Sequence, residues 1–209
     1  MKKSIFILLF TFFSVNIFAQ NKLVSIGVGG GATFMSTNVT LEHGPLKSDA
    51  VGGNYFFNGF FNVTPKLSLG VEYEKALGLL THDNNTISNE RTKVNNFSFK
   101  MKYYLTETKI RPYVGFGVGR YTFIPGKYEI DPMKLITTNN LSSLSVTEDQ
   151  KSSAVGYVPE IGLDLAFFQL AVLYHIVPEF ELTKGNKKFD TEYKSLEFRA
   201  SINIGLISR

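Results

Sequence analysis

Apolar and polar residues alternate with a period of two along most of the chain beyond residue 21. The last alternating segment is the clearest, because every second residue from Leu196 to Leu206 is apolar and the residues between are polar or glycine. Since successive side chains of a strand point to opposite faces, this pattern predicts a β-strand with one apolar face. At least eight such segments occur, at about residues 22–35, 51–63, 67–74, 96–105, 112–119, 155–165, 169–176 and 195–206.

The connections between these segments alternate in length. Those after the second, fourth and sixth segments are a few residues long, whereas the other four cover about residues 37–50, 79–92, 125–153 and 178–192 and are polar. Short turns at one end and long polar loops at the other are typical of outer-membrane barrels. The sequence therefore predicts an all-β fold, an eight-stranded antiparallel up-and-down transmembrane β-barrel.

The direction of the apolar face distinguishes a membrane barrel from a soluble lipocalin-like carrier, which has its apolar side chains inside. The non-apolar face here is rich in Gly, Ser and Asn and has few scattered charges, as expected for a narrow lumen. The row from Leu196 to Leu206 rises roughly 25 Å when tilted, which matches the height of a lipid-facing band. Five tyrosines lie in or near strand segments, where aromatic girdles form: Tyr55, Tyr73, Tyr103, Tyr113 and Tyr174. These features favour apolar side chains outside.

Charged residues recur on the predicted inner face. A charge enclosed in a narrow barrel requires a partner, so these residues predict a salt-bridge network in the lumen. Glycines on residues 22–35 and 112–119 would leave room for the long side chains. The alternative is that some of these charges lie above the bilayer in water. The network comprises Glu72, Glu74, Lys100, Lys102, Glu160, Asp164, Glu197 and Arg199.

The N-terminus has the pattern of a secretory signal peptide. Lys2 and Lys3 precede an apolar run at residues 5–13, and the small residue Ala19 follows near the expected cleavage point. The run is too short for a membrane-spanning helix, which takes roughly 20 apolar residues, although a retained anchor helix is the alternative. We therefore expect a signal peptide at residues 1–20 and an outer-membrane β-barrel domain at residues 21–209.

Composition excludes several classes of function. Without Lys2 and Lys3 the chain has 20 basic residues against 18 acidic ones, which gives no basic stripe for nucleic acid. Cysteine is absent, so disulfides, thiolate metal sites and a lipid-bearing cysteine are ruled out. The glycine-rich run at residues 27–32 resembles a dinucleotide-binding loop but lacks the βαβ context, and we interpret it as lumen packing.

Several stretches resemble the small OmpA/OmpX-like outer-membrane β-barrel family. They are the run RPYVGFGVG at residues 111–119, PEIGLD at residues 159–164, and the closing strand through Gly205. The resemblance implies a fold and an outer-membrane location, and it implies no reaction. Many members end on a phenylalanine used in assembly, whereas this chain ends in Leu206-Ile207-Ser208-Arg209. No C-terminal peptidoglycan-binding domain follows, so wall anchoring is not expected.

A catalytic or metal site is not expected. Hydrolysis would require histidine with a nucleophile and an orienting acid, and only His43, His82 and His175 are present. His43 and His82 lie in predicted loops, and we interpret His175 as a lumen or rim residue. Three dispersed histidines make a poor metal site, and the acidic residues Glu148 and Asp149 lack calcium-ligand spacing.

The sequence thus predicts a non-enzymatic outer-membrane barrel with a filled polar lumen and no cofactor. Its expected partners are outer-membrane lipid, the barrel assembly machinery, and an external protein or glycan that meets the long loops, above all residues 125–153. A barrel-embedded hydrolase or acyltransferase acting on lipid, and the soluble lipocalin-like carrier, are the alternatives.

Overall fold

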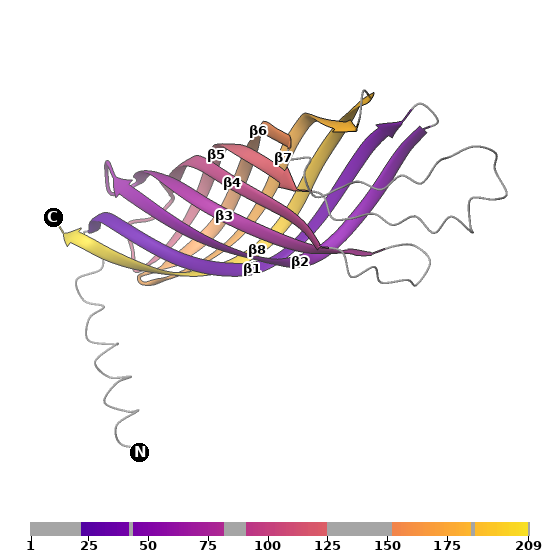
Figure 1. Cartoon of the computed structure of the whole chain (residues 1–209). Helices are drawn as coiled ribbons and strands as arrows, with labels where there is room; N and C mark the ends of the chain where they lie inside the picture. Colours follow the sequence, from indigo (N-terminus) through magenta and orange to yellow (C-terminus); the bar gives the residue numbers. More distant parts are fainter. Residues whose placement is uncertain (1–21, 42–43, 82–90, 125–151, 185–186, 209) are drawn as a thin grey trace, which may run out of the picture.

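The computed structural model describes residues 22–41, 44–81, 91–124, 152–184 and 187–208. Eight antiparallel strands pair in sequence order and close into a barrel when β8 pairs with β1 (Figure 1). This is the all-β up-and-down architecture that the alternation predicted. The strands are β1 (Lys22–Leu41), β2 (Gly44–Asn62), β3 (Leu67–Thr81), β4 (Arg91–Tyr104), β5 (Ile110–Ile124), β6 (Ser152–Leu165), β7 (Phe168–Lys184) and β8 (Lys187–Ser208).

Burial alternates with every residue along the strands, and the apolar face is outside. On β8, Phe198 and Ile202 are about half exposed, whereas Glu197 and Arg199 beside them are buried. A soluble carrier has the opposite arrangement, so that alternative is wrong. Within the part of the chain that the structure describes, no helix is long and apolar enough to cross a membrane.

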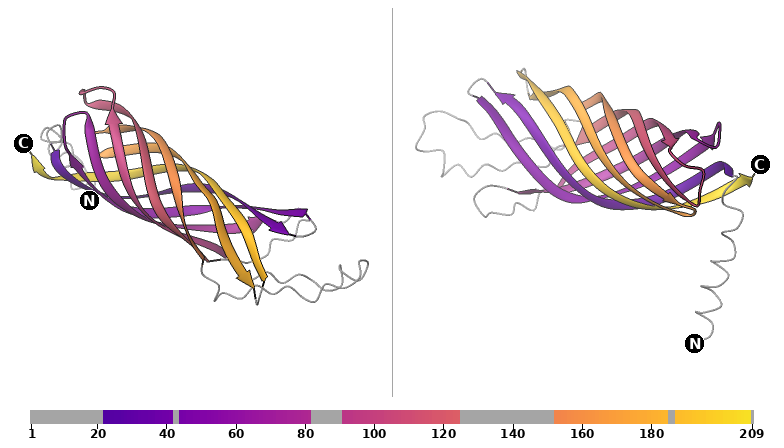
Figure 2. Two further views of the ribbon diagram at one scale, coloured as in Figure 1. Left: turned by 90° about the horizontal axis from the view of Figure 1, so that it is seen from above. Right: turned by 180° about the vertical axis from the view of Figure 1, so that it is seen from behind.

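Short turns join the strands at the end of the barrel that holds the C-terminus (Figures 1 and 2). In the β2–β3 turn, the Thr64 hydroxyl accepts a hydrogen bond from the Leu67 backbone N–H at 2.9 Å. In the β4–β5 turn, the Thr108 hydroxyl donates to the Ile110 carbonyl at 2.7 Å. The β6–β7 turn needs only Ala166 and Phe167, and Ala166 adopts a positive φ of 68° that lets the strands reverse tightly. Ala166 therefore adopts a conformation that glycine often takes in such turns.

Two of the four predicted long loops are largely strand. Residues 37–50 continue the β1–β2 ladder to the pair Leu41 and Gly44, and residues 178–192 continue the β7–β8 ladder to the pair Lys184 and Lys187. The prediction of loops there was wrong, because outward residues such as Lys47, Asp49 and Glu192 are polar beyond the apolar band and interrupt the pattern without interrupting the pairing. The other two connections, at residues 82–90 and 125–151, lie outside the described residues, as does the predicted signal peptide.

The lumen contains two layers of side chains. Nearest the loop end is a cluster that we call the apolar plug: Met35, Ala50, Ala76, Val94, Tyr121, Phe123, Val177, Phe180 and Tyr193. Below it, towards the short turns, is a set of ionisable residues that we call the charged layer: Glu72, Glu74, Lys100, Lys102, Glu160, Glu197 and Arg199. Both layers are built from the inward residues of neighbouring strands, so closure of the barrel buries them together.

Candidate functional site in the lumen

Glycines on the inner face make room for the charged layer. Lys100 on β4 lies opposite Gly117 on β5, and Glu160 on β6 lies opposite Gly115. A Cβ atom at Gly117 would come within 3.1 Å of the Lys100 side chain, and one at Gly115 within 3.1 Å of Glu160. The absence of side chains on β5 therefore lets the long side chains of its two neighbours lie across it.

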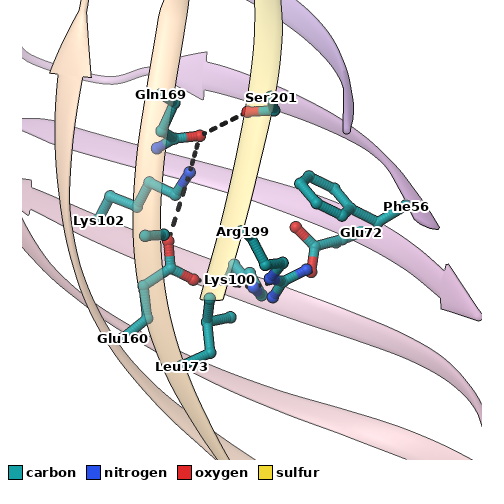
Figure 3. A pocket seen from close by; sticks show the side chains of 10 residues that line it. Phe56, Glu72, Lys100, Lys102, Glu160, Gln169, Leu173, Arg199 and Ser201 are labelled. Atoms are coloured by element: carbon teal, nitrogen blue, oxygen red, sulfur yellow. Dashed lines mark hydrogen bonds and ion pairs between the residues drawn. The ribbon is translucent and has the colours of Figure 1, made fainter. Parts of the chain in front are cut away.

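Lys100 joins two acids from different strands. Its Nζ atom lies 2.8 Å from Glu72 Oε1 on β3 and 2.8 Å from Glu160 Oε2 on β6 (Figure 3). Glu160 also accepts a hydrogen bond from the Tyr113 hydroxyl at 2.6 Å and has Lys102 Nζ at 3.6 Å. A cation held by two carboxylates at this distance crosslinks strands that are not neighbours in the barrel wall.

Arg199 extends the network from β8. Its Nη1 atom donates to Glu72 Oε1 at 2.8 Å and lies 3.6 Å from Glu74 Oε2, and its Nε atom lies 3.5 Å from Glu197 Oε2. The guanidinium also lies 4.4 Å from the centre of the Phe56 ring, which is a cation–π distance. Lys100 and Arg199 thus share Glu72, and seven of the eight residues of the predicted network form one connected cluster.

Asp164 is the eighth predicted residue, and the structure places it apart. Its Oδ2 atom accepts a hydrogen bond from Arg111 Nη2 at 2.7 Å, nearer the short turns. At the same end, Lys22 Nζ donates to the carbonyl of Ala166 at 2.6 Å. These contacts tie the start of β1 and the start of β5 to the β6–β7 turn, so they close the bottom of the lumen.

His175 is a member of the cluster that the sequence did not identify. It is 2% exposed, and its Nε2 atom lies 3.4 Å from Glu197 Oε2 and 3.8 Å from Glu74 Oε2. Its Nδ1 atom shares a hydrogen bond with the Tyr121 hydroxyl at 2.8 Å. His175 therefore lies deep in the lumen rather than at a rim. Its position on the polar face of β7 was visible in the alternation, but the partners across the lumen were not.

Tyr113, Phe56 and Phe60 also point inward. The sequence pattern had included Tyr113 among the tyrosines of the outer girdles, yet Tyr113 is 2% exposed and its hydroxyl donates a hydrogen bond to Glu160. The other four tyrosines of that set are exposed on the lipid side. Inward aromatic rings fill the space between charged side chains, and Lys102 Nζ lies 3.9 Å from the centre of the Phe60 ring.

Little space remains in the lumen. A cavity among the residues of the charged layer measures about 10 Å³, and a second one within the apolar plug also measures about 10 Å³. Each can hold about one water molecule. A larger hollow of about 750 Å³ lies among outward-facing side chains such as Val114, Ile161 and Phe198, and it belongs to the lipid side of the wall. The lumen is therefore packed.

The sequence matches the profile of the outer membrane protein beta-barrel domain over residues 5–202. The chain belongs to this family. The match spans almost the whole chain and agrees with the closed barrel and its outward apolar face, so the protein is an outer-membrane β-barrel. A search of the curated proteins found no match.

Several solved barrels are similar in outline. Neisserial surface protein A is 13% identical, with a TM-score of 0.44 over 85% of this chain and 96% of that one. The attachment invasion locus protein Ail of Yersinia pestis is 9% identical, with a TM-score of 0.46 over 86% and 98%. The outer membrane protease OmpT from Escherichia coli is 12% identical, with a TM-score of 0.39 over 86% and 95%.

Proposed function

We propose that this outer-membrane protein forms no open channel and acts through the surface that its strands present outside the cell. The observation that supports this is the packed lumen, where the apolar plug lies above the charged layer and the cavities measure about 10 Å³. Barrels of about eight strands have an interior just wide enough for side chains, and aqueous diffusion channels need roughly twice as many strands. A structural or binding role therefore fits the interior better than transport.

The external surface that we propose is a sheet of four strands. β7, β8, β1 and β2 are consecutive neighbours in the barrel, because β8 pairs with β1 as far as the pair Val39 and Thr191. On either side, the β1–β2 ladder and the β7–β8 ladder continue to their hairpin ends, beyond β5 and β6 (Figure 1). A paired sheet is a more rigid platform than a loop, and rigid scaffolds suit recognition.

The outward side chains on this sheet are polar where the apolar band has ended. Lys47 and Asp49 on β2 are exposed, as are Glu192 and Lys194 on β8. Among the described residues, the β2–β3 pairs end at Asp49 and Thr81, whereas residues 44–48 of β2 pair with β1 alone. A strand that continues past its neighbour offers backbone donors and acceptors to an added strand. We therefore propose an external protein, recognised by strand addition, as the partner.

One experiment tests the closed lumen. The purified full-length barrel would be inserted into planar lipid bilayers, and its conductance would be compared with that of a large porin. We expect no long-lived conducting state under conditions where the porin conducts. Steady conductance in proportion to the amount of inserted protein would refute the closed barrel.

A second experiment tests the external sheet. In one variant, residues 39–46 are replaced by an Asn-Gly turn, which joins the paired residues Asn38 and Lys47. In a control variant, residues 130–146 are deleted from the connection after β5. Both would be compared with the intact protein on protein and glycan arrays, after a heat-shift gel has verified folding. Loss of a protein ligand in the first variant alone supports the proposal. Loss in the control alone would place binding on the β5–β6 connection, and a glycan ligand would refute strand addition.

We further propose that the protein is not an enzyme. His175 is enclosed in the lumen by the wall of the barrel, so a hydrolase acting on lipid would depend on His43 and His82, which lie outside the described residues. Lipid A from cells expressing the wild type and the double variant His43→Ala/His82→Ala would be compared by mass spectrometry. We expect identical spectra. A modified lipid A that disappears in the variant would establish the hydrolase or acyltransferase instead.

Export and assembly complete the proposal. We propose that residues 1–20 act as a signal peptide, that the assembly machinery for barrels inserts the chain, and that lipid contacts its apolar face. N-terminal sequencing of the protein from outer membranes tests the first point. A mature N-terminus near residue 20 is expected, and an intact Met1 would refute it.

A further inference from the structure

In the lumen, three buried residues from three different strands bring atoms that can bind a metal close together. Glu74 comes from β3, His175 from β7 and Glu197 from β8, and each is at most 2% exposed. One ligand atom from each lies within 4.8 Å of the others. From this geometry we propose that Glu74, His175 and Glu197 form a binding site for one zinc ion inside the barrel.

The spacing fits tetrahedral zinc. Zinc binds imidazole nitrogen and carboxylate oxygen at about 2.0–2.1 Å, which puts the ligand atoms of a tetrahedron about 3.3 Å apart. His175 Nε2 lies 3.4 Å from Glu197 Oε2 and 3.8 Å from Glu74 Oε2. The two distances from His175 are therefore close to those of a zinc tetrahedron, and the three ligand atoms all lie within 4.8 Å of one another. One histidine and two carboxylates are also a ligand set that zinc accepts.

His175 is oriented as metal-binding histidines are. Its Nδ1 atom is hydrogen-bonded to the Tyr121 hydroxyl at 2.8 Å, and the tyrosine ring meets the imidazole edge to face at 5.7 Å. A partner on one ring nitrogen fixes the ring and the tautomer, and leaves the other nitrogen to bind metal. When Nδ1–H donates to Tyr121, the lone pair of Nε2 faces the two carboxylates, and a cation between them would bind all three groups.

Two atoms at this point lack any hydrogen-bond partner. Among the described residues, both His175 Nε2 and Glu74 Oε2 are buried and unpartnered. The acceptor nearest to Nε2 is Glu197 Oε2 at 3.4 Å, which is longer than the usual N–H···O distance of about 2.7–3.2 Å. Fifteen buried side-chain atoms of the described residues lack such a partner, and these two lie only 3.8 Å apart, so a single bound ion would serve both.

The surrounding charge also favours a cation. The charged layer contains four carboxylates and three cationic side chains, so it has a formal excess of one negative charge while His175 is neutral. Asn54 Nδ2 donates to Glu197 Oε2 at 2.5 Å and to Glu74 Oε1 at 3.2 Å, and Arg199 is the nearest cation. Its short bond goes to Glu72 at 2.8 Å, whereas its contacts with Glu74 and Glu197 are 3.5–3.6 Å long. Arg199 therefore reduces the negative potential at the site without occupying it.

The burial of the three ligands predicts how zinc enters and leaves the site. The barrel wall surrounds the three ligands, and the apolar plug closes the lumen on the loop side. We expect zinc to enter while the barrel closes during folding and to leave slowly once it has closed. A chelator should therefore remove zinc from the unfolded chain and leave the folded barrel loaded.

Metal content tests the proposal directly. The full-length protein would be unfolded, refolded into detergent micelles with Zn²⁺, freed of excess metal with a chelator and analysed by mass spectrometry for metals. We expect one zinc per folded wild-type barrel, and at least about a tenfold loss in Glu197→Gln and His175→Ala. Glu192→Gln, an exposed acid on the same strand, is the matched control and should keep the metal. Equal zinc in all four proteins, or none in the wild type, would overturn the site.

Two further measurements do not depend on variants that could fail to fold. Wild-type barrel refolded with Zn²⁺ should melt roughly 5–10 °C higher than barrel refolded with a chelator, at a metal concentration about a hundredfold above Kd. Refolding with Co²⁺ should give the visible absorption of a tetrahedral complex. A third measurement uses a conservative variant. Tyr121→Phe, which removes only the hydroxyl that positions His175, should weaken zinc binding by about tenfold or more. Unchanged melting together with no cobalt absorption would refute zinc binding.

Discussion

Replacing Lys100 with methionine removes the cation that joins Glu72 to Glu160 and leaves a side chain of similar length. Lys100 Nζ is 2.8 Å from a carboxylate oxygen of each acid, and all three side chains are at most 4% exposed. The substitution therefore leaves two buried carboxylates with fewer partners. Their charges have no water to restore the lost solvation, which is why the cost should be large.

The magnitude follows from the remaining contacts. Removal of one member of a buried ion pair costs about 3–5 kcal/mol, and Lys100 serves two acids. Glu72 keeps Arg199 at 2.8 Å, and Glu160 keeps the Tyr113 hydroxyl at 2.6 Å and Lys102 at 3.6 Å. Because these partners persist, we expect the free energy of unfolding to fall by about 3–5 kcal/mol rather than by twice that amount.

Urea unfolding of the purified barrel in micelles measures this change. The chain has no tryptophan, so far-UV circular dichroism and the heat-shift gel would report the folded fraction. The same substitution at Lys66, an exposed turn residue 3.9 Å from Glu107, should change stability by less than about 1 kcal/mol. This control separates the loss of a buried charge from the loss of a lysine.

A double variant tests the reasoning more sharply. In Lys100→Met/Glu160→Gln, one of the two carboxylates that lose Lys100 is replaced by a neutral amide. The double variant should therefore lose about 1–3 kcal/mol less free energy of unfolding than the sum of the two single variants. The ion pairing would be refuted if the free energy of unfolding of Lys100→Met were within about 1 kcal/mol of the wild-type value. It would also be refuted if the effects of the two substitutions on that free energy were additive. Either result would place these side chains in water rather than in a closed lumen.

Three other tests probe the remaining parts of the barrel with the same urea assay, and two of them include a control substitution. Phe123→Ala empties a buried position of the apolar plug and should cost about 3–5 kcal/mol, whereas a loss below about 1 kcal/mol would mean that the plug is not packed. Gly31→Ala would place a Cβ atom against the backbone of β8 and should cost about 1–3 kcal/mol, but Gly59→Ala, with 4.0 Å of clearance, should be nearly neutral. Ile161→Arg puts a charge on the lipid face near mid-strand and should cost about 2–4 kcal/mol, against about 0–1 for Ile110→Arg beside the β4–β5 turn, and equal costs would contradict the lipid-facing band.

The ends of the strands show where sequence patterns fail. The alternation with apolar residues outside stops near residues 37 and 178, because beyond the lipid the outer face of a strand meets water and no longer requires apolar residues. The hydrogen-bonded ladders nevertheless continue to Leu41 and Lys184. Backbone pairing needs no particular side chain, so strand length could not be predicted from hydrophobic period alone.

The inner contacts show a second limit. The pattern placed Glu72, Lys100 and Arg199 on the polar face, but a face is a property of one strand, whereas the contacts join β3 to β8 across the lumen. Which side chains meet depends on strand tilt and on the stagger between strands, and these are set only when the barrel closes. For the same reason Asp164 lies with Arg111 apart from the cluster, and His175 joins it.

The sequence by itself determined the strand number and the order of pairing, because a period of two and alternating connection lengths are local properties of the chain. It favoured an outward apolar face and charges inside the lumen, but left a soluble carrier and charges above the bilayer as alternatives. Only the tertiary structure decided the partners of each charge, the inward turn of Tyr113, Phe56 and Phe60, and the meeting of Glu74, His175 and Glu197. Some of these contacts link residues that are far apart in the sequence, as in the Arg199–Glu72 bond, which spans 127 positions. Closure of the barrel brings such residues together.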